Sequence, residues 1–232
     1  MLGPMEVLLI RHGEPEWDRD GFGVDNPGLT ARGRHQAQAV AEHLAGHPDL
    51  GIDEIWVSPL ERAQQTAAPL AARTGIEPRT LDWLAEIAAP TFDGTPTEAV
   101  ARVFAEGWAR PLDELWDGLP GGETFRHFHE RVTTGLTGAL GAVGATRLDL
   151  TPPLWSLPQA ERRVAIVAHG GTNATAIGFL LGIDPVPWEW LRFVTAHASL
   201  SVLSPLAISE GHAFSLHPFG DVSHLPPDLH TR

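Results

Sequence analysis

The chain of 232 residues carries 29 acidic and 16 basic residues, which gives a formal net charge of −13 at pH 7. A charge this negative argues against nucleic acid or an anionic membrane as a partner, and any phosphate-binding pocket must be a local positive island built by particular arginines. Cysteine is absent from the sequence, which excludes disulfides, thiolate catalysis and cysteine-ligated zinc.

The length of the chain suits one α/β domain and is short for two, so we expect a single domain over residues 1–232. No apolar run approaches the length of a membrane-spanning helix. Met1-Leu2-Gly3-Pro4 lacks the basic and then apolar pattern of a secretory signal. These features predict a cytoplasmic protein.

In chain order, the apolar residues alternate between strand-like and helix-like patterns. Strands are predicted over residues 5–10, 52–57, 77–81 and 164–168. Helices are predicted over residues 30–44 (with Thr30 as the N-cap), 60–73, 95–108, 123–143 and 171–181. This alternation predicts an α/β fold, a sandwich with a mostly parallel central sheet and helices on both faces.

Three segments lack a clear helical or parallel-strand pattern. The polar stretch over residues 14–28 is expected to be a loop. Residues 146–161 are proline-rich and without periodicity, which predicts a surface excursion that covers the site, meets a partner or is a passive loop. The tail over residues 191–216 alternates enough for two or three partly antiparallel strands, and an edge strand there could pair two copies into a homodimer.

Two of the predicted strands are followed at their carboxyl ends by a histidine and then a glycine. Arg11-His12-Gly13 follows the first strand, and His169-Gly170-Gly171 follows the strand over 164–168. In open α/β sheets, ligands bind at the carboxyl ends of the strands. An imidazole beside a guanidinium suits phosphoryl transfer, because arginine grips phosphate oxygens bidentately while a neutral ring nitrogen can attack phosphorus.

Five ordered blocks of the sequence resemble the motifs of the histidine phosphatase superfamily, which has the phosphoglycerate-mutase-like fold. The blocks are residues 11–14, 29–37, 58–67, 84–86 and 168–171. A lone Arg-His-Gly is weak as a motif, whereas five blocks in the right order and spacing are specific. The resemblance runs from about Glu6 to Ile183 and implies a three-layer sandwich with the helices in the outer layers.

The resemblance also implies a role for each matching residue. His12 would be the nucleophile that forms a phosphohistidine, with its other ring nitrogen donating to a backbone carbonyl. Arg11 and Arg62 would clamp the phosphoryl oxygens, and His169 would complete the clamp. Gly170 would let the backbone approach the phosphate and offer an N–H at a helix start.

Two carboxylates complete the set of candidate site residues. Glu86 would be the general acid that protonates the leaving group and then deprotonates the attacking water. Similar proteins often carry Trp-Asn where this chain has Trp17-Asp18, and a carboxylate facing a phosphate dianion would be repulsive. Asp18, as a candidate substrate-binding residue, is therefore expected to turn away, to pair with an arginine such as Arg19, or to be protonated at acidic pH.

The resulting functional prediction is a metal-independent phosphomonoester hydrolase, a histidine acid-type phosphatase that acts on a small phosphorylated metabolite. No cofactor is expected, and no metal, because no histidine pair has convincing ligand spacing. A phosphoglycerate mutase is the alternative, but Glu86 is followed by Ile87-Ala88-Ala89-Pro90 and the chain has neither the lysine nor the tyrosine with which such mutases hold a carboxylate. A regulatory protein that binds phosphate without turnover is a further alternative.

Overall fold

The computed structural model describes residues 5–46 and 51–232. The expectation made for residues 1–4 lies outside this description. The strands are β1 (Met5–Arg11), β2 (Asp18–Arg19), β3 (Phe22–Gly23), β4 (Glu54–Val57), β5 (Arg79–Thr80), β6 (Thr146–Arg147), β7 (Trp155–Ser156), β8 (Arg162–Ala168), β9 (Leu200–Ile208) and β10 (Gly211–Leu216). The helices are α1 (Ala31–Ala45), α2 (Glu61–Thr74), α3 (Thr97–Trp108), α4 (Phe125–Ala142), α5 (Gly170–Leu180) and α6 (Glu189–Arg192).

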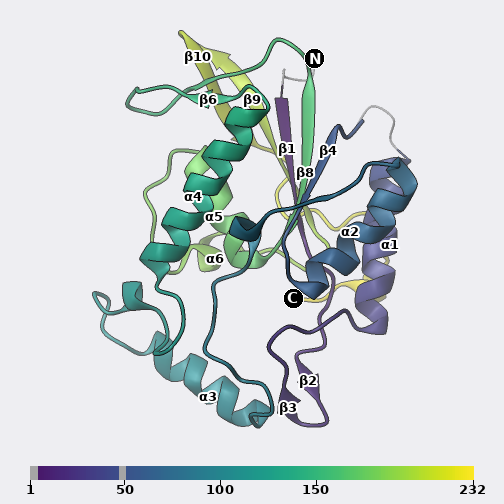
Figure 1. Ribbon diagram of the computed structural model, residues 1–232, viewed down its shortest axis with the longest axis vertical. Coiled ribbons are helices and arrows are strands. Elements are labelled where there is room, and N and C mark those ends of the chain that lie inside the picture. Colours follow the sequence, from purple (N-terminus) through teal and green to yellow (C-terminus); the bar gives the residue numbers. More distant parts are fainter. Residues whose placement is uncertain (1–4, 47–50) are drawn as a thin grey trace.

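A single sheet with the strand order β5-β4-β8-β1-β9-β10-β7-β6 forms the centre of the molecule (Figure 1). Parallel pairs join β5, β4, β8 and β1, and antiparallel pairs continue from β1 to the edge strand β6. The register sets Arg11 of β1 opposite Ala168 of β8. His12 and His169, the next residues of the two strands, therefore leave the sheet at neighbouring points.

Alternate residues of the central strands face opposite sides of the sheet, because successive strand side chains point to opposite faces. Leu8 and Ile10 of β1 pack with the buried faces of α1 and α2. Val7 and Leu9 pack with α4 and α5 on the other side. The predicted α/β sandwich, with a mostly parallel sheet and helices on both faces, is thereby confirmed, and Figure 1 shows the two helical layers on either side of the sheet.

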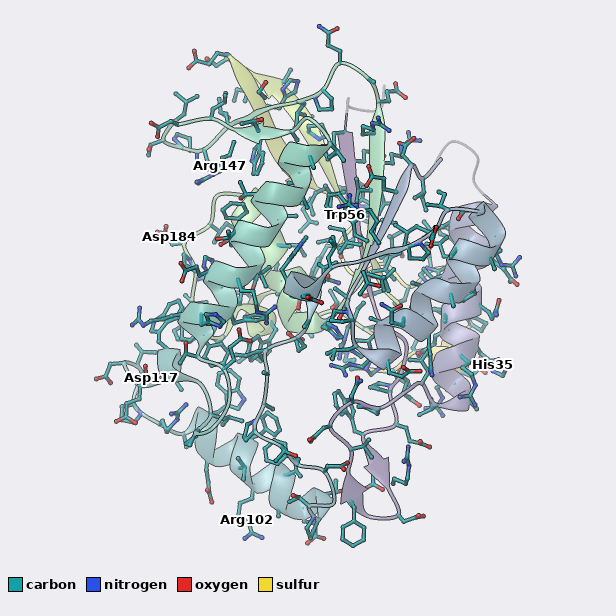
Figure 2. All side chains as sticks on the ribbon, viewed as in Figure 1. His35, Trp56, Arg102, Asp117, Arg147 and Asp184 are labelled. Atoms are coloured by element: carbon teal, nitrogen blue, oxygen red, sulfur yellow. The ribbon has the colours of Figure 1, made fainter. Side chains whose placement is uncertain are left out.

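Trp56 of β4 belongs to the core on the α4 and α5 side of the sheet. Its side chain is fully buried, and Figure 2 shows it near the middle of the molecule. By contrast, His35 is exposed on the outer side of α1 (Figure 2). Thr30 begins α1 as predicted, since its side chain accepts a hydrogen bond from the backbone N–H of Gly33 at 3.0 Å.

The segment over residues 146–161 contributes to the sheet, which its sequence does not indicate. It contains β6 and β7, and β7 pairs with β10. Trp155 is fully buried between the rings of Phe179 and Phe214. The prolines interrupt the periodicity of the segment, while the buried indole anchors it to the α5 side of the sheet.

No helix in the part of the chain that the structure describes is long and apolar enough to cross a lipid bilayer.

Candidate active site

His12 lies at the carboxyl end of β1, and its main chain bridges the two neighbouring strands. Its N–H donates to the carbonyl of Ala168 at 2.9 Å, and its carbonyl accepts from the N–H of Ala198 at 3.2 Å. The side chain is 3% exposed. The imidazole is therefore fixed in place by the central strands of the sheet.

The contacts of the His12 ring define which nitrogen carries the proton. Nδ1 lies 2.7 Å from the carbonyl oxygen of Gly13, which can only accept a hydrogen bond. The guanidinium Nε of Arg62 donates to Nε2 at 3.3 Å, and a guanidinium can only donate. Nδ1 thus holds the proton and Nε2 presents its lone pair. This is the tautomer that a nucleophilic histidine requires.

Arg62 comes from the first turn of α2 and Arg11 from the last position of β1. Burial lowers the pKa of Arg62 to about 10, with Glu86 opposing and Arg11 adding to the shift. Both guanidiniums remain charged at neutral pH. The Arg62 guanidinium also lies 4.6 Å from the centre of the Trp17 ring, a cation–π contact that covers its outer side.

His169 is the N-cap residue of α5 and is fully buried. Its ring centroid lies 5.1 Å from that of His12. Its Nε2 is 2.7 Å from Oγ of Ser58, the residue that follows β4. The ends of β1, β8 and β4 therefore each supply one polar residue to the same point.

Three buried nitrogen atoms around His12 have no hydrogen-bond partner among the residues that the structure describes. They are Nε of Arg11, Nη1 of Arg62 and Nδ1 of His169. Buried donors are nearly always paired in folded proteins, because an unpaired one keeps its full desolvation cost. Two cationic groups and an imidazole with unused nitrogens form a cradle suited to a tetrahedral anion.

The carboxylate of Glu86 lies at the amino end of α5. Its Oε2 accepts from the N–H of Gly171 at 2.8 Å, and its Oε1 lies 3.5 Å from the hydroxyl of Thr172. Its negative charge raises the pKa of both Arg11 and Arg62, against the effect of burial. Glu86 thus shares the site with the two arginines.

An ion pair between Arg131 of α4 and Glu123, which precedes that helix, holds the segment that carries Glu86. Arg131 binds both carboxylate oxygens of Glu123, at 2.9 and 2.8 Å, and its Nη1 donates to the carbonyls of Trp83 and Ala85. The same Glu123 accepts from the N–H of Ala88 at 3.2 Å. Backbone groups on both sides of Glu86 are therefore tied to one side-chain pair.

Gly170 and Asp18 lie in different surroundings. A Cβ built on Gly170 would lie 3.7 Å from Nε of Arg11, so the start of α5 faces that guanidinium. Asp18 is exposed, and its carboxylate accepts from the N–H of Gly21 and from the hydroxyl of Thr97. Arg19 pairs with Glu16 and not with Asp18. The structure thus engages both oxygens of Asp18 in tying β2 and β3 to α3.

His197 is a site residue that the sequence analysis missed. Its ring centroid lies 5.6 Å from that of His12, and its Nε2 accepts from Nη2 of Arg11 at 3.3 Å. Its Nδ1 donates to Oγ1 of Thr231 at 2.8 Å. Arg11 also donates to the carbonyl of Thr195 at 2.5 Å. His197 follows no motif in the sequence, and only the return of the tail to β1 brings it here.

The buried histidines of the site are neutral at physiological pH. Burial, reinforced by the charges of Arg62 and Arg11, holds the pKa of His12 and His169 well below 6.5, and His169 adds to the effect on His12. Burial and the charge of Arg11 lower the pKa of His197 to about 4. In the unfolded chain these histidines would bind a proton near their ordinary pKa, whereas in the folded protein they do not.

This difference predicts a loss of stability in mild acid. The free energy of unfolding should be constant above about pH 6.5 and fall toward about pH 4, by up to about 1.4 kcal/mol per pH unit for each such histidine. Glu189, whose pKa burial raises, opposes this effect with one proton. Urea unfolding at neutral pH and at about pH 5 measures the change. His197→Gln should make the dependence shallower and the exposed His35→Gln should not; equal stability at both pH values would contradict the prediction.

In residues 5–46 and 51–232, no group of three or more His, Cys, Asp or Glu side chains is arranged to hold a metal ion.

Comparison with known families decides what kind of protein carries this site. The model of the histidine phosphatase superfamily (branch 1) matches residues 7–207. The chain belongs to the histidine phosphatase superfamily. The match spans all five motif blocks and confirms the family resemblance inferred from them.

Known proteins align over nearly the full chain. The probable phosphoglycerate mutase GpmB of Salmonella paratyphi B is 28% identical over 228 residues, 95% of each protein. A mycobacterial glucosyl-3-phosphoglycerate phosphatase, solved in complex with VO3, has 26% identity and a TM-score of 0.68, with 92% of this chain and 98% of that chain covered. The alpha-ribazole phosphatase of Shigella flexneri, at 23% identity, shares the fold with a TM-score of 0.67, and 91% and 95% of the two chains are covered.

Proposed function

We propose that this protein is a metal-independent phosphomonoester hydrolase that acts on a small phosphorylated metabolite through a phosphohistidine at His12. One observation carries the proposal: a buried, neutral imidazole has its unprotonated Nε2 beside the buried Arg62 and the half-buried Arg11, each of which has a buried nitrogen without a partner. Such a pairing attracts a phosphate dianion and offers it a nucleophile in the same place.

In the first step, Nε2 of His12 attacks phosphorus and the bond from phosphorus to the leaving oxygen breaks. Charge on the three equatorial oxygens is met by Arg11, Arg62 and a proton on Nδ1 of His169. Ser58 supports that tautomer of His169 if its hydroxyl donates to Nε2, at the observed 2.7 Å. Gly170 adds a backbone N–H at the start of α5.

We assign the proton transfer in both steps to Glu86. Protonated Glu86 gives its proton to the leaving oxygen, which departs as an alcohol. The resulting carboxylate then takes a proton from a water molecule, whose oxygen attacks phosphorus as the bond to Nε2 breaks. Inorganic phosphate leaves, and His12 and Glu86 return to their starting forms.

The role of Asp18 in this scheme is indirect. With its oxygens on Gly21 and Thr97, the carboxylate organises the β2–β3 hairpin next to Trp17, which stacks on Arg62. Asp18 therefore supports phosphate binding only by holding the hairpin, and its carboxylate does not contact the phosphate.

A phosphoglycerate mutase and a phosphate-binding regulator are the alternatives. The kinship with GpmB favours the mutase, since that relative is a probable phosphoglycerate mutase. All 16 basic residues of this chain are arginines, so a mutase here would lack the lysine that holds a carboxylate in similar mutases. A pure regulator has no use for the Nε2 lone pair that His12 presents.

The decisive experiment is hydrolysis of p-nitrophenyl phosphate by the purified protein with EDTA present. We expect steady release of phosphate that EDTA does not reduce. The same protein incubated with 3-phosphoglycerate tests the mutase, and interconversion of phosphoglycerates in place of phosphate release would decide for it. If the protein binds phosphate tightly but turns over neither substrate, the result would support the phosphate-binding regulator.

A further inference from the structure

Helix α3 lies away from the sheet, below the carboxyl ends of the central strands (Figure 1). None of its residues, all of which the structure describes, is buried. Arg102 points outward from α3 (Figure 2), whereas Phe104 and Trp108 remain 42% and 37% exposed. Large apolar side chains left open on one helix face usually mark a binding surface.

The inner face of α3 forms one wall of a cavity. The empty space amounts to about 470 Å³, part of which is open to solvent. Trp108, Phe125 and Trp190 form an aromatic cluster at its wall, with Trp190 at 5.7 Å from Trp108 and 5.0 Å from Phe125 between ring centroids. Flat rings of this kind accept other flat rings in edge-on or offset geometry.

The cavity adjoins the proton donor assigned above. Ile87 and Ala88, the two residues that follow Glu86, line it. A methyl group built on Gly171 would lie 2.5 Å from Oε1 of Glu86 and 3.1 Å from Cε3 of Trp190. The carboxylate and the indole are therefore neighbours across the first turn of α5. Since Glu86 protonates the leaving oxygen, the group attached to that oxygen must extend past Glu86.

The charged residues that line the cavity, among the described residues, are Arg110 and Glu123, and both are engaged within the protein. Arg110 donates to the carbonyls of Gly107 and Gly118, and Glu123 is held by Arg131. A carboxylate or second phosphate placed here would meet the carboxylate of Glu123 and a guanidinium whose Nε and Nη2 already donate to backbone carbonyls. A charge in such surroundings is costly unless it is paired.

We propose that this cavity holds the leaving group of the substrate, and that the substrate is a phosphate monoester of an alcohol bearing an uncharged aromatic ring. The inference rests on the proposed hydrolase function, because it uses Glu86 as the donor to the leaving oxygen. It narrows the substrate from small phosphorylated metabolites in general to those whose alcohol is aromatic and carries no charge.

Two matched substrate pairs test this assignment. Naphthyl and phenyl phosphate release alcohols of similar acidity and differ in one fused ring, while phenylethyl and carboxyethyl phosphate exchange a ring for a carboxylate on the same linker. We expect kcat/KM to favour the larger or uncharged member of each pair by roughly tenfold or more, from the added apolar burial.

A pair of variants on α3 ties the preference to the cavity. Phe104→Asp places a carboxylate in the lining, and Ala105→Asp adds the same charge at the next, exposed residue outside it. Phe104→Asp should bring the naphthyl to phenyl ratio to about 1, while Ala105→Asp should leave it unchanged. Because Phe104 is partly exposed on a helix without buried residues, its substitution should not prevent folding, which circular dichroism checks.

The outcomes separate the two proposals. If p-nitrophenyl phosphate is not hydrolysed at all, the hydrolase function is wrong. If it is hydrolysed but both substrate ratios are near unity, or both variants change the ratio equally, the hydrolase stands and the aromatic leaving-group site is overturned.

Discussion

Replacement of His12 by alanine is expected to abolish phosphatase activity. Its Nε2 carries the lone pair to which we assign the attack on phosphorus, because Nδ1 donates its hydrogen to the carbonyl of Gly13. Loss of a covalent nucleophile lowers kcat by roughly 10⁴-fold or more. Hydrolysis of p-nitrophenyl phosphate, followed by nitrophenol absorbance with EDTA present, measures the loss.

His12 is buried, so the variant must be shown to fold. His12→Asn keeps a side chain of similar size and should be equally inactive, while His35→Ala on the outer side of α1 should retain full activity. Wild-type protein quenched in base during turnover should carry a phosphoryl group that is lost in acid, as expected for phosphohistidine. Substantial turnover by a folded His12→Asn protein would place the nucleophile elsewhere.

Glu86→Gln is expected to slow hydrolysis in a way that depends on the leaving group. A poor leaving group such as an alkoxide needs a proton as it departs, and the loss of a general acid costs roughly 10²–10⁴-fold. p-Nitrophenolate leaves without a proton, so the first step with that ester should be affected far less. Comparison of kcat/KM for phenylethyl and p-nitrophenyl phosphate in the variant measures the difference.

Glutamine is a near-isosteric choice for this test. Its amide oxygen can still accept from the N–H of Gly171, which keeps the start of α5 in place. Glu130→Gln, at an exposed position of α4, is the matched control and should change neither substrate. An equal loss for both esters would mean that Glu86 positions the arginines and does not transfer the proton.

The extent to which the sequence predicts this protein differs from element to element. The strands that precede His12 and His169 can be predicted from the sequence because buried parallel strands are continuous apolar runs. The β2–β3 hairpin was missed although its turn carries the Asp20-Gly21 pair, with φ of 55° and 87°, that is typical of a two-residue hairpin loop. This turn motif can be recognised in the sequence, but the polar composition of residues 14–28 led to the prediction of a loop.

Other parts of the site have no local signal. His197 reaches Arg11 because the tail folds back so that Thr231 holds its other ring nitrogen. Arg131 of α4 and Glu123, which precedes that helix, hold the backbone on both sides of Glu86 from positions far along the chain. Such contacts depend on which elements become neighbours, and a single sequence does not encode them as a recognisable spacing.

The position of β1 at the centre of the sheet has a consequence for biosynthesis. β1, which is synthesised before both of its partners, is hydrogen-bonded on one side to β8, beginning at Arg162, and on the other to β9, beginning at Leu200. Its apolar residues stay unpaired until the residues from Arg162 onward have been synthesised, and such delayed, distant pairing favours slow folding and aggregation. Nascent chains released early would expose the apolar residues of β1, so the yield of intact protein should respond to chaperones and to growth temperature.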